Sequence, residues 1–367
     1  MNGDLILVIV IATALAFDVT NGFHDTANVV ATAISTRAIA PRPAVAAASL
    51  LNFAGAFISL KVATTVAKGF VATDAVTMTV VFAGLVGAIA WNIITWYFGL
   101  PSSSSHALIG GLVGAVAAAS GFGAVNGAGL VSDLIVPAIA APIIAFLTAS
   151  VGILVIYRVV GRLRPGPTSR GFRLGQLASS GLLALSHGTN DAQKTMGVIT
   201  LALVAHGNIS ATSFHVPTWV VIASASAISI GTFSGGWRII RTVGTRIVKM
   251  DPAQGLAAQG AGAAVILAAS SVGYPLSTTH VISGGIMGAG AGKRLSAVRW
   301  GVAGNIVAGW MITIPAAGVF GAVVYALTRL FGHSAAGPLV IVCVLLVALG
   351  AVFARRARQA AAAPATQ

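Results

Sequence analysis

The sequence predicts an all-α polytopic membrane protein built from two inverted-topology repeats, each with three spans and one re-entrant helical hairpin, and one extra C-terminal helix. Three observations lead to this prediction. Only 8% of the 367 residues are charged and 57% are hydrophobic, whereas soluble domains carry about 25% charged residues. Apolar runs close to the length that crosses a bilayer recur along the chain. Two pairs of motifs repeat in the same order, at offsets of 166 and 174 residues.

Basic residues give the orientation, because cytoplasmic loops carry an excess of Lys and Arg. They gather in five short clusters, at residues 37–42, 158–173, 238–249, 293–299 and 355–358. If every apolar segment crossed the membrane fully, these clusters could not all lie on one side. They can if two segments enter and leave by the same side. The resulting topology places the N-terminus outside and the C-terminus in the cytoplasm. We expect the protein to lie in the cytoplasmic (inner) membrane of the cell.

The elements follow in order from this topology. Residues 1–160 form the first repeat, with spans at about 5–36, 44–67 and 131–157 and a hairpin at about 77–120 that enters from outside. Residues 161–173 are a basic cytoplasmic linker. Residues 174–330 form the second repeat, with spans at about 174–205, 217–235 and 300–327 and a hairpin at about 255–292 that enters from the cytoplasm. A C-terminal helix lies within 331–355, and a disordered tail follows at 356–367. Three spans per repeat is an odd number, so the second repeat is inverted, as in many transporters.

The acidic residues indicate where the function lies. The chain contains seven acidic residues and all are Asp. Asp18, Asp25 and Asp191 stand inside apolar segments, where an ionisable group is costly and therefore a functional candidate.

The first motif, "FDVTNGFHDTAN", contains Asp18, Asn21, Asp25 and Asn28 at spacings of 3, 4 and 3 residues. On a helix these residues form one polar stripe. Carboxylate and amide oxygens are hard ligands that suit Na⁺ or Mg²⁺, and a carboxylate can also take a proton. Gly22 marks a point where the helix could unwind and offer carbonyl groups. The alternative is a hydrogen-bonded seam between helices.

The second motif, "SHGTNDAQKTMG", places His187, Asp191 and Lys194 on one helical face at spacings of 4 and 3 residues. Lys194 stands where the first motif has Asn28. Its ammonium forms a structural ion pair with Asp191, takes the place of a bound cation, or faces an anionic substrate. His24 and His187 are either hydrogen-bonded residues or proton carriers, because histidine titrates near neutral pH.

The other repeated pair is "PSSSSHALIGGLVG" from position 101 and "PLSTTHVISGGIMG" from position 275. Each proline ends the incoming helix, and the next hydroxyl residue caps the outgoing one. The N-terminus of that helix is an anion site. Capping alone needs about one hydroxyl, but these tips carry four and three. His106 and His280 have either a structural role or contact with substrate.

These features favour a secondary transporter whose tips bind an anion and whose Asp motifs bind the driving cation. The alternatives are an intramembrane hydrolase, with a serine and a histidine as nucleophile and base, and a channel. The net charge of +14 lies in short patches between apolar runs, which excludes a nucleic-acid partner. No phosphate-cradling loop indicates ATP hydrolysis, and Cys343 is the only cysteine, so no intrachain disulfide can form. No enzyme activity and no resident cofactor are expected.

The motifs resemble those of the inorganic phosphate transporter (PiT) family. "NGFHDTAN" and "HGTND" are similar to its duplicated G-A-N-D signature, and "PSSSSH" and "PLSTTH" to its P-x-S-x-T-H hairpins. The resemblance implies a homodimer that imports inorganic phosphate with Na⁺ or H⁺. It implies phosphate binding by Ser103, Ser104, Ser105, Ser277, Thr278 and Thr279. It assigns the coupling cation to Asp25, Asp191, Asn21, Asn28 and Asn190.

The sequence also departs from the signature. It has Gly-Phe-His-Asp in the first copy, and Gln193-Lys194 in the second where a Na⁺-coupled member keeps a neutral ligand. His24 and Lys194 resemble the bacterial low-affinity members, which look proton-coupled and carry neutral metal–phosphate complexes, with Mg²⁺ as one such metal. We therefore expect H⁺ coupling, with a Na⁺-coupled phosphate or sulfate symporter of the same fold as the alternative.

Overall fold

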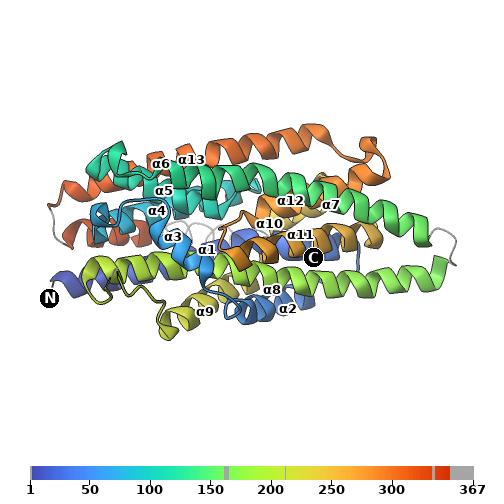
Figure 1. Cartoon of the computed structure of the whole chain (residues 1–367), viewed down its shortest axis with the longest axis horizontal. Coiled ribbons are helices and arrows are strands. Elements are labelled where there is room, and N and C mark those ends of the chain that lie inside the picture. Colours follow the sequence, from blue (N-terminus) through green and yellow to red (C-terminus); the bar gives the residue numbers. More distant parts are fainter. Residues whose placement is uncertain (1, 161–164, 211, 333–334, 348–367) are drawn as a thin grey trace, which may run out of the picture.

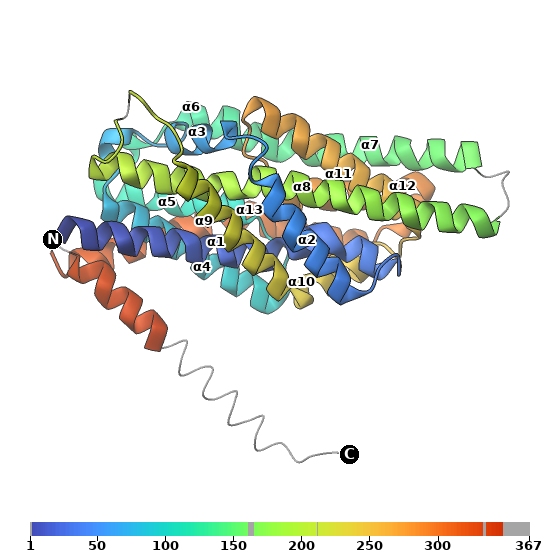
Figure 2. The ribbon, with the colours of Figure 1, turned by 90° about the horizontal axis from the view of Figure 1, so that it is seen from below.

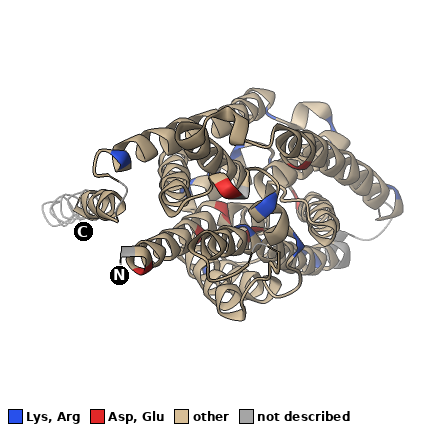
Figure 3. Ribbon diagram, turned by 60° about the vertical axis from the view of Figure 1, so that its left-hand side comes forward, with Lys and Arg blue, Asp and Glu red and all other residues tan. Residues whose placement is uncertain are grey.

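The computed structural model describes residues 2–160, 165–210, 212–332 and 335–347, and its regular secondary structure there is helical. Five of the described helices are long and apolar enough to cross a membrane. The number rises to six if the helices Thr218–Ser234 and Trp237–Arg246, which are bent by 61° to each other, count as one span. The all-helical, multi-pass class is therefore confirmed. Most of the ribbon in Figure 3 carries neither acidic nor basic residues, which suits a lipid-embedded bundle.

The first half contains five main helices before its last span. They are α1 (Asn2–Ser35), α2 (Pro41–Gly55), α3 (Lys61–Lys68), α4 (Met78–Phe98) and α5 (Ser104–Ser120). The expected single span at 44–67 is wrong, because the chain breaks between α2 and α3. The break directly follows Gly55, and glycine is about 1 kcal/mol poorer than alanine as a helix former. The last span is α7 (Val136–Val160), which continues the short α6 (Gly127–Gly129) and the π-helical η3 (Leu130–Ile135).

The second half begins with the long α8 (Pro165–His206). Its start lies inside the stretch 161–173 that we expected to be a linker, and proline is favoured in the first turn of a helix. Only 161–164 precede it, and these lie outside the described residues. The other helices are α9 (Thr218–Ser234), α10 (Trp237–Arg241), the π-helical η4 (Thr242–Arg246), α11 (Pro252–Val272), α12 (Thr278–Lys293) and α13 (Trp300–Arg329).

The expected C-terminal elements are covered only in part. A helix occupies 336–347, within the range predicted for the extra C-terminal helix. Residues 348–355 and the predicted tail at 356–367 lie outside the described residues. The inverted relation of the two halves stays a prediction, but it requires α1 and α8 to run in opposite directions. Figures 1 and 2 show them antiparallel.

The two halves interlock. Helix α1 of the first half packs along α9 of the second, and α8 packs along α2 and α3. The α4–α5 hairpin packs against α13, and the α11–α12 hairpin packs against α7. Small residues make these contacts close: a Cβ at Gly114 would lie 2.0 Å from Gly318 O, and one at Gly288 would lie 2.1 Å from Phe146 O.

The two hairpins turn back inside the protein. The α4–α5 hairpin lies mainly in the left half of Figure 1 and the α11–α12 hairpin in the right half. Their tips are buried and touch each other: Ser105 Oγ lies 3.4 Å from Leu276 O, and the rings of His106 and His280 have centroids 4.6 Å apart. The re-entrant character predicted for both hairpins requires such interior tips.

Candidate functional site

The polar stripe of α1 lies wholly inside the protein. Asp18, Asn21, Asp25 and Asn28 are each at most 2% exposed. The helix does not unwind at Gly22, as we had allowed, but continues to Ser35. The reason is packing, because a Cβ at Gly22 would lie 2.3 Å from Ile228 O of α9. The glycine therefore permits helix contact instead of offering free carbonyl groups.

The same arrangement recurs on α8. His187, Asn190, Asp191 and Lys194 are buried in one continuous helix. A Cβ at Gly188 would lie 2.0 Å from Asn52 O of α2. Both Asp-bearing helices are thus continuous at their motifs. Because α8 carries these polar residues, its mean hydropathy is low, and it is not among the five apolar candidate spans.

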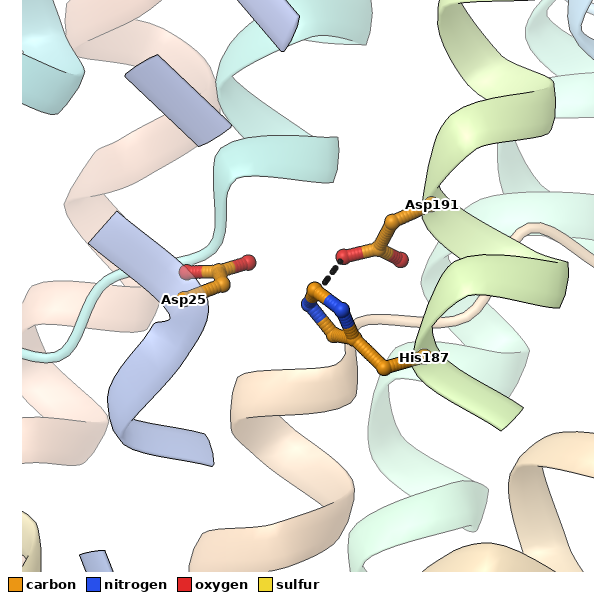
Figure 4. Close-up of side chains that lie close together, drawn as sticks. All are labelled: Asp25, His187 and Asp191. Atoms are coloured by element: carbon orange, nitrogen blue, oxygen red, sulfur yellow. Dashed lines mark ion pairs between the residues drawn. The ribbon is translucent and has the colours of Figure 1, made fainter. Parts of the chain in front are cut away.

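The two helix motifs meet in space. Ligand atoms of Asp25 on α1 and of His187 and Asp191 on α8 all lie within 4.8 Å of one another, and their side chains converge in Figure 4. His187 Nε2 is 3.1 Å from Asp191 Oδ2, and its Nδ1 is 3.3 Å from Asn52 Oδ1. Two carboxylates and an imidazole are a donor set that suits a divalent cation or a proton.

Ser103 and Ser277 cap the helices that leave the tips. Ser103 Oγ accepts a hydrogen bond of 3.1 Å from the backbone N–H of His106, and Ser277 Oγ accepts one of 3.3 Å from that of His280. Capping orders the first turn of α5 and α12 and leaves the following hydroxyls to face the interior.

The remaining tip hydroxyls point at the carboxylates. Ser104 Oγ donates to Asp25 Oδ1 over 3.2 Å, and Thr279 Oγ1 lies 3.5 Å from the same oxygen. Thr278 Oγ1 donates to Asp191 Oδ2 over 3.3 Å. One carboxylate therefore contacts both tips, and the other contacts the second tip.

Lys194 links the second motif to both tips. Its buried ammonium contacts Asp191 Oδ1 at 2.5 Å, donates to Leu276 O over 2.8 Å, and donates to Ser105 Oγ. A buried ammonium is costly unless it is paired and hydrogen-bonded, and here it is both. The structural ion pair that we considered for Lys194 is present. The same ammonium also lies where an anion between the tips would meet it.

His24 bridges the first motif to α4. Its Nδ1 is 2.7 Å from Asp25 Oδ1 and its Nε2 is 3.1 Å from Thr95 Oγ1. Ser102 Oγ donates to Thr95 Oγ1 over 2.8 Å. Sequence reasoning did not single out Thr95 or Ser102 as site residues. The signal that could have found them is the hydroxyl group itself: Thr95 lies in an otherwise apolar helix, and Ser102 belongs to the serine run of the first tip.

The three asparagines take different positions. Asn28 Nδ2 donates to Thr279 Oγ1 over 2.9 Å, which ties α1 to the second tip. Asn190 Nδ2 donates to Ser270 Oγ over 2.8 Å. Asn21 Oδ1, Asn190 Oδ1 and both carboxylate oxygens of Asp18 are buried without a hydrogen-bond partner in the described structure. Thr195 lies near Asp18 but outside hydrogen-bonding geometry.

The orphaned oxygens of Asp18 and Asn21, one helical turn apart on α1, form a second group of acceptors near Asp191. A buried acceptor without a donor costs about 1–3 kcal/mol, so several in one place suit a bound cation or a proton on Asp18.

His106 and His280 pack at the tips. His280 stacks on Trp310 with ring centroids 4.0 Å apart, and Trp310 Nε1 donates to Pro101 O over 3.1 Å.

Comparisons with known proteins agree with this architecture. A family model described as the phosphate transporter family matches residues 21–168 and 162–321. A probable low-affinity inorganic phosphate transporter of Mycobacterium tuberculosis is 53% identical over 333 residues, which cover 90% of this chain and 80% of the relative. A probable low-affinity inorganic phosphate transporter of Bacillus subtilis is 44% identical over 325 residues, covering 88% of this chain and 96% of the relative.

One solved structure is similar over almost the whole chain. It is titled the sodium-dependent phosphate transporter, with a TM-score of 0.76 and 24% sequence identity, and it covers 89% of this chain and 99% of that chain. At this identity the match supports the fold alone.

Proposed function

The chain belongs to the phosphate transporter family, and from this premise we propose that it is a secondary active symporter that imports inorganic phosphate across the cytoplasmic membrane. The family is one of transporters, so neither the hydrolase nor any other enzyme class is retained. In this proposal the basic clusters lie inside, which places the N-terminus outside and the C-terminus in the cytoplasm.

One observation carries the proposal: two hydroxyl-bearing tips meet at two buried carboxylates. The tips present Ser104, Ser105, Thr278 and Thr279 at the N-termini of α5 and α12. Helix N-termini and hydroxyl donors stabilise an oxyanion without adding a charge to the bilayer. Ser104 and Thr278 donate to Asp25 and Asp191, and a bound phosphate would replace these carboxylates as their acceptor.

The carboxylates favour phosphate over sulfate. A hydrogen phosphate ion carries an O–H that can donate to a carboxylate oxygen, whereas sulfate has only acceptors. Asp25 Oδ1 lies within 3.5 Å of hydroxyls from both tips, so a bound oxyanion there would touch it. Sulfate in the same place has no O–H to donate, so its oxygens would face the carboxylate oxygens without a hydrogen bond whenever Asp25 is ionised.

Lys194 supports H⁺ as the coupling ion. Its ammonium is a tethered cation beside Asp191, at the position where the first motif has the neutral Asn28. A further metal cation next to it would be repelled, whereas a proton on Asp25 or His24 needs no added ligand. The acceptor cluster around Asp18 and Asn21 supports the alternative, a Na⁺-coupled phosphate or sulfate symporter.

A divalent metal is the remaining part of the cargo question. The ligand atoms of Asp25, His187 and Asp191 lie close enough together to contact one ion. A neutral metal–phosphate complex with Mg²⁺ would place its metal there and its phosphate oxygens against the tips, and the phosphate charge that travels with the metal would offset the repulsion by Lys194 that a bare cation meets. In that case the metal enters as substrate and leaves with the phosphate.

The test is uptake of labelled phosphate or sulfate by the purified protein in liposomes, with gradients of H⁺ and Na⁺ and the Mg²⁺ concentration varied separately. We expect phosphate uptake to follow an imposed pH gradient, acidic outside, and to exceed sulfate uptake. Uptake that follows the Na⁺ gradient and ignores the pH gradient contradicts H⁺ coupling. Faster uptake of sulfate contradicts the substrate assignment.

A further inference from the structure

A second polar site lies outside the one described above. A pocket of 390 Å³ lies where the C-terminal end of α4 meets α10 and η4, and Figure 2 shows α10 beside the end of α4. Its lining is Tyr97, Phe98, Gly99, Trp237, Arg238, Arg241, Thr242 and Arg246. Three of the eight residues are arginines and none is acidic. None of the residues of the carboxylate site lines this pocket.

The three arginines of the pocket have no acidic residue beside them in its lining to neutralise their charge. Arg238 Nη1 donates to the backbone carbonyl of Tyr97, and Thr242 Oγ1 donates to Gly99 O over 2.9 Å. These bonds satisfy carbonyl groups at the end of α4, which have no partner within the helix. Within the described part of the chain, no carboxylate pairs with Arg238, Arg241 or Arg246.

The surroundings of the pocket indicate a ligand with both a charged and an apolar part. A guanidinium presents a planar fork of donors that binds a phosphate group through two parallel hydrogen bonds. Tyr97, Phe98 and Trp237 at the rim are 51%, 69% and 49% exposed. Exposed aromatic side chains of this kind gather at the boundary between membrane and water. Basic pockets between helices at the cytoplasmic boundary bind phospholipid head groups.

We propose that the arginine pocket binds the phosphate group of an anionic phospholipid, held by Arg241 and Arg246 beside Arg238. Free inorganic phosphate offers the same group and is the second possible source. The location gives the site a consequence. Gly99 ends α4 with a φ of 67°, and Pro101 begins the hydroxyl tip two residues later. The occupant would therefore lie beside the segment that carries the first tip.

The experiment uses the purified full chain in detergent, without any gradient, so its outcome does not depend on the proposed transport. Short-chain phosphatidylglycerol, short-chain phosphatidylcholine and inorganic phosphate are titrated separately. Binding is measured by native mass spectrometry for the lipids and by the thermal unfolding midpoint for all three. We expect phosphatidylcholine, which has the phosphodiester but no net charge, to bind about 10-fold more weakly than phosphatidylglycerol, a difference of about 1.4 kcal/mol.

The decisive variant is Arg241→Gln/Arg246→Gln, which leaves the Arg238 contact with Tyr97 in place. It should raise the Kd for phosphatidylglycerol ~10-fold or more, since it removes both guanidinium groups that donate charge-assisted hydrogen bonds to the phosphate. The matched control, Arg170→Gln/Arg173→Gln on α8, removes the same charge and should leave the Kd unchanged. Arg241→Lys/Arg246→Lys keeps the charge without the forks and should give an intermediate Kd.

Four outcomes are distinguishable. Loss of phosphatidylglycerol binding in the pocket variant alone supports the lipid source. Loss of inorganic phosphate binding in that variant, with phosphatidylglycerol binding unchanged, supports the pocket and identifies free phosphate as the source. Equal binding of every probe by the pocket variant and the α8 control overturns the proposal, as does equal binding of the two lipids by the unaltered protein.

Discussion

The motifs on α1 and α8 make equivalent contacts with the two hairpin tips, but the side chains that make these contacts differ in charge. Asn28 of the first half donates to Thr279 in the second tip, and Lys194 of the second half donates to Ser105 in the first tip. Each motif thus holds the tip of the other half. The counterpart positions carry a neutral amide in one half and an ammonium in the other.

This difference separates the two carboxylates. Asp191 is paired with Lys194, whose Nζ lies 2.5 Å from its Oδ1. Asp25 faces hydroxyl donors and the imidazole of His24, which is charged only when protonated. The two halves therefore share a geometry, but the contact with the opposite tip is made by an amide in the first motif and by an ammonium in the second. In the proposed function, Asp25 would be the carboxylate that exchanges a mobile ion.

The largest effect should come from Asp25→Asn. The amide keeps the size of the side chain but cannot hold a proton, so we expect concentrative phosphate uptake into liposomes to be abolished while the protein still inserts. Asp74→Asn, at an exposed carboxylate, is the control and should transport normally. An Asp25→Asn protein that concentrates phosphate as well as the unaltered one would remove Asp25 from the coupling role.

Next in size should be Lys194→Met. It leaves Asp191 buried without its ammonium partner, and breaking a buried ion pair costs about 3–5 kcal/mol. The measurement is the free energy of unfolding in detergent. The double variant Lys194→Met/Asp191→Asn removes the orphaned charge and should recover part of the loss. If the double variant is as unstable as Lys194→Met, the ammonium acts through contacts other than Asp191.

A smaller effect tests the matching helix contacts. Gly22→Ala and Gly188→Ala each place a Cβ within 2.3 Å of a backbone oxygen of the other half, and overpacking of this kind costs about 1–3 kcal/mol. Gly260→Ala on α11, where no heavy atom lies within 4 Å, is the control and should be neutral or slightly stabilising. Unequal losses at Gly22 and Gly188 would show that the two contacts are not equivalent in energy.

The smallest effect should come from the caps. Ser103→Ala and Ser277→Ala each remove one N-cap acceptor, and such a loss costs about 1 kcal/mol. Ser103→Thr and Ser277→Thr keep the hydroxyl and should restore most of the stability. A variant that loses phosphate affinity at unchanged stability would assign that serine to the substrate instead of the cap.

Part of the fold could be predicted because it rests on local rules. The tips at Pro101 and Pro275 follow from proline geometry and capping, and the helix faces of both motifs follow from their spacing. The boundaries were less predictable. The break between α2 and α3 and the uninterrupted helix at Gly22 depend on which backbone a glycine faces, such as Leu185 O for Gly55.

The sequence by itself determined the membrane class, the duplicated motifs and the candidate residues, because composition and periodicity are properties of short stretches of chain. Only the tertiary structure decided which residues meet. It brought Asp25 and Asp191 together. It also placed Thr95 within hydrogen-bonding distance of His24, 71 positions away in sequence, and brought Lys194 into contact with both tips. These contacts depend on the packing of interlocked halves, in which small residues let helices distant in sequence approach closely.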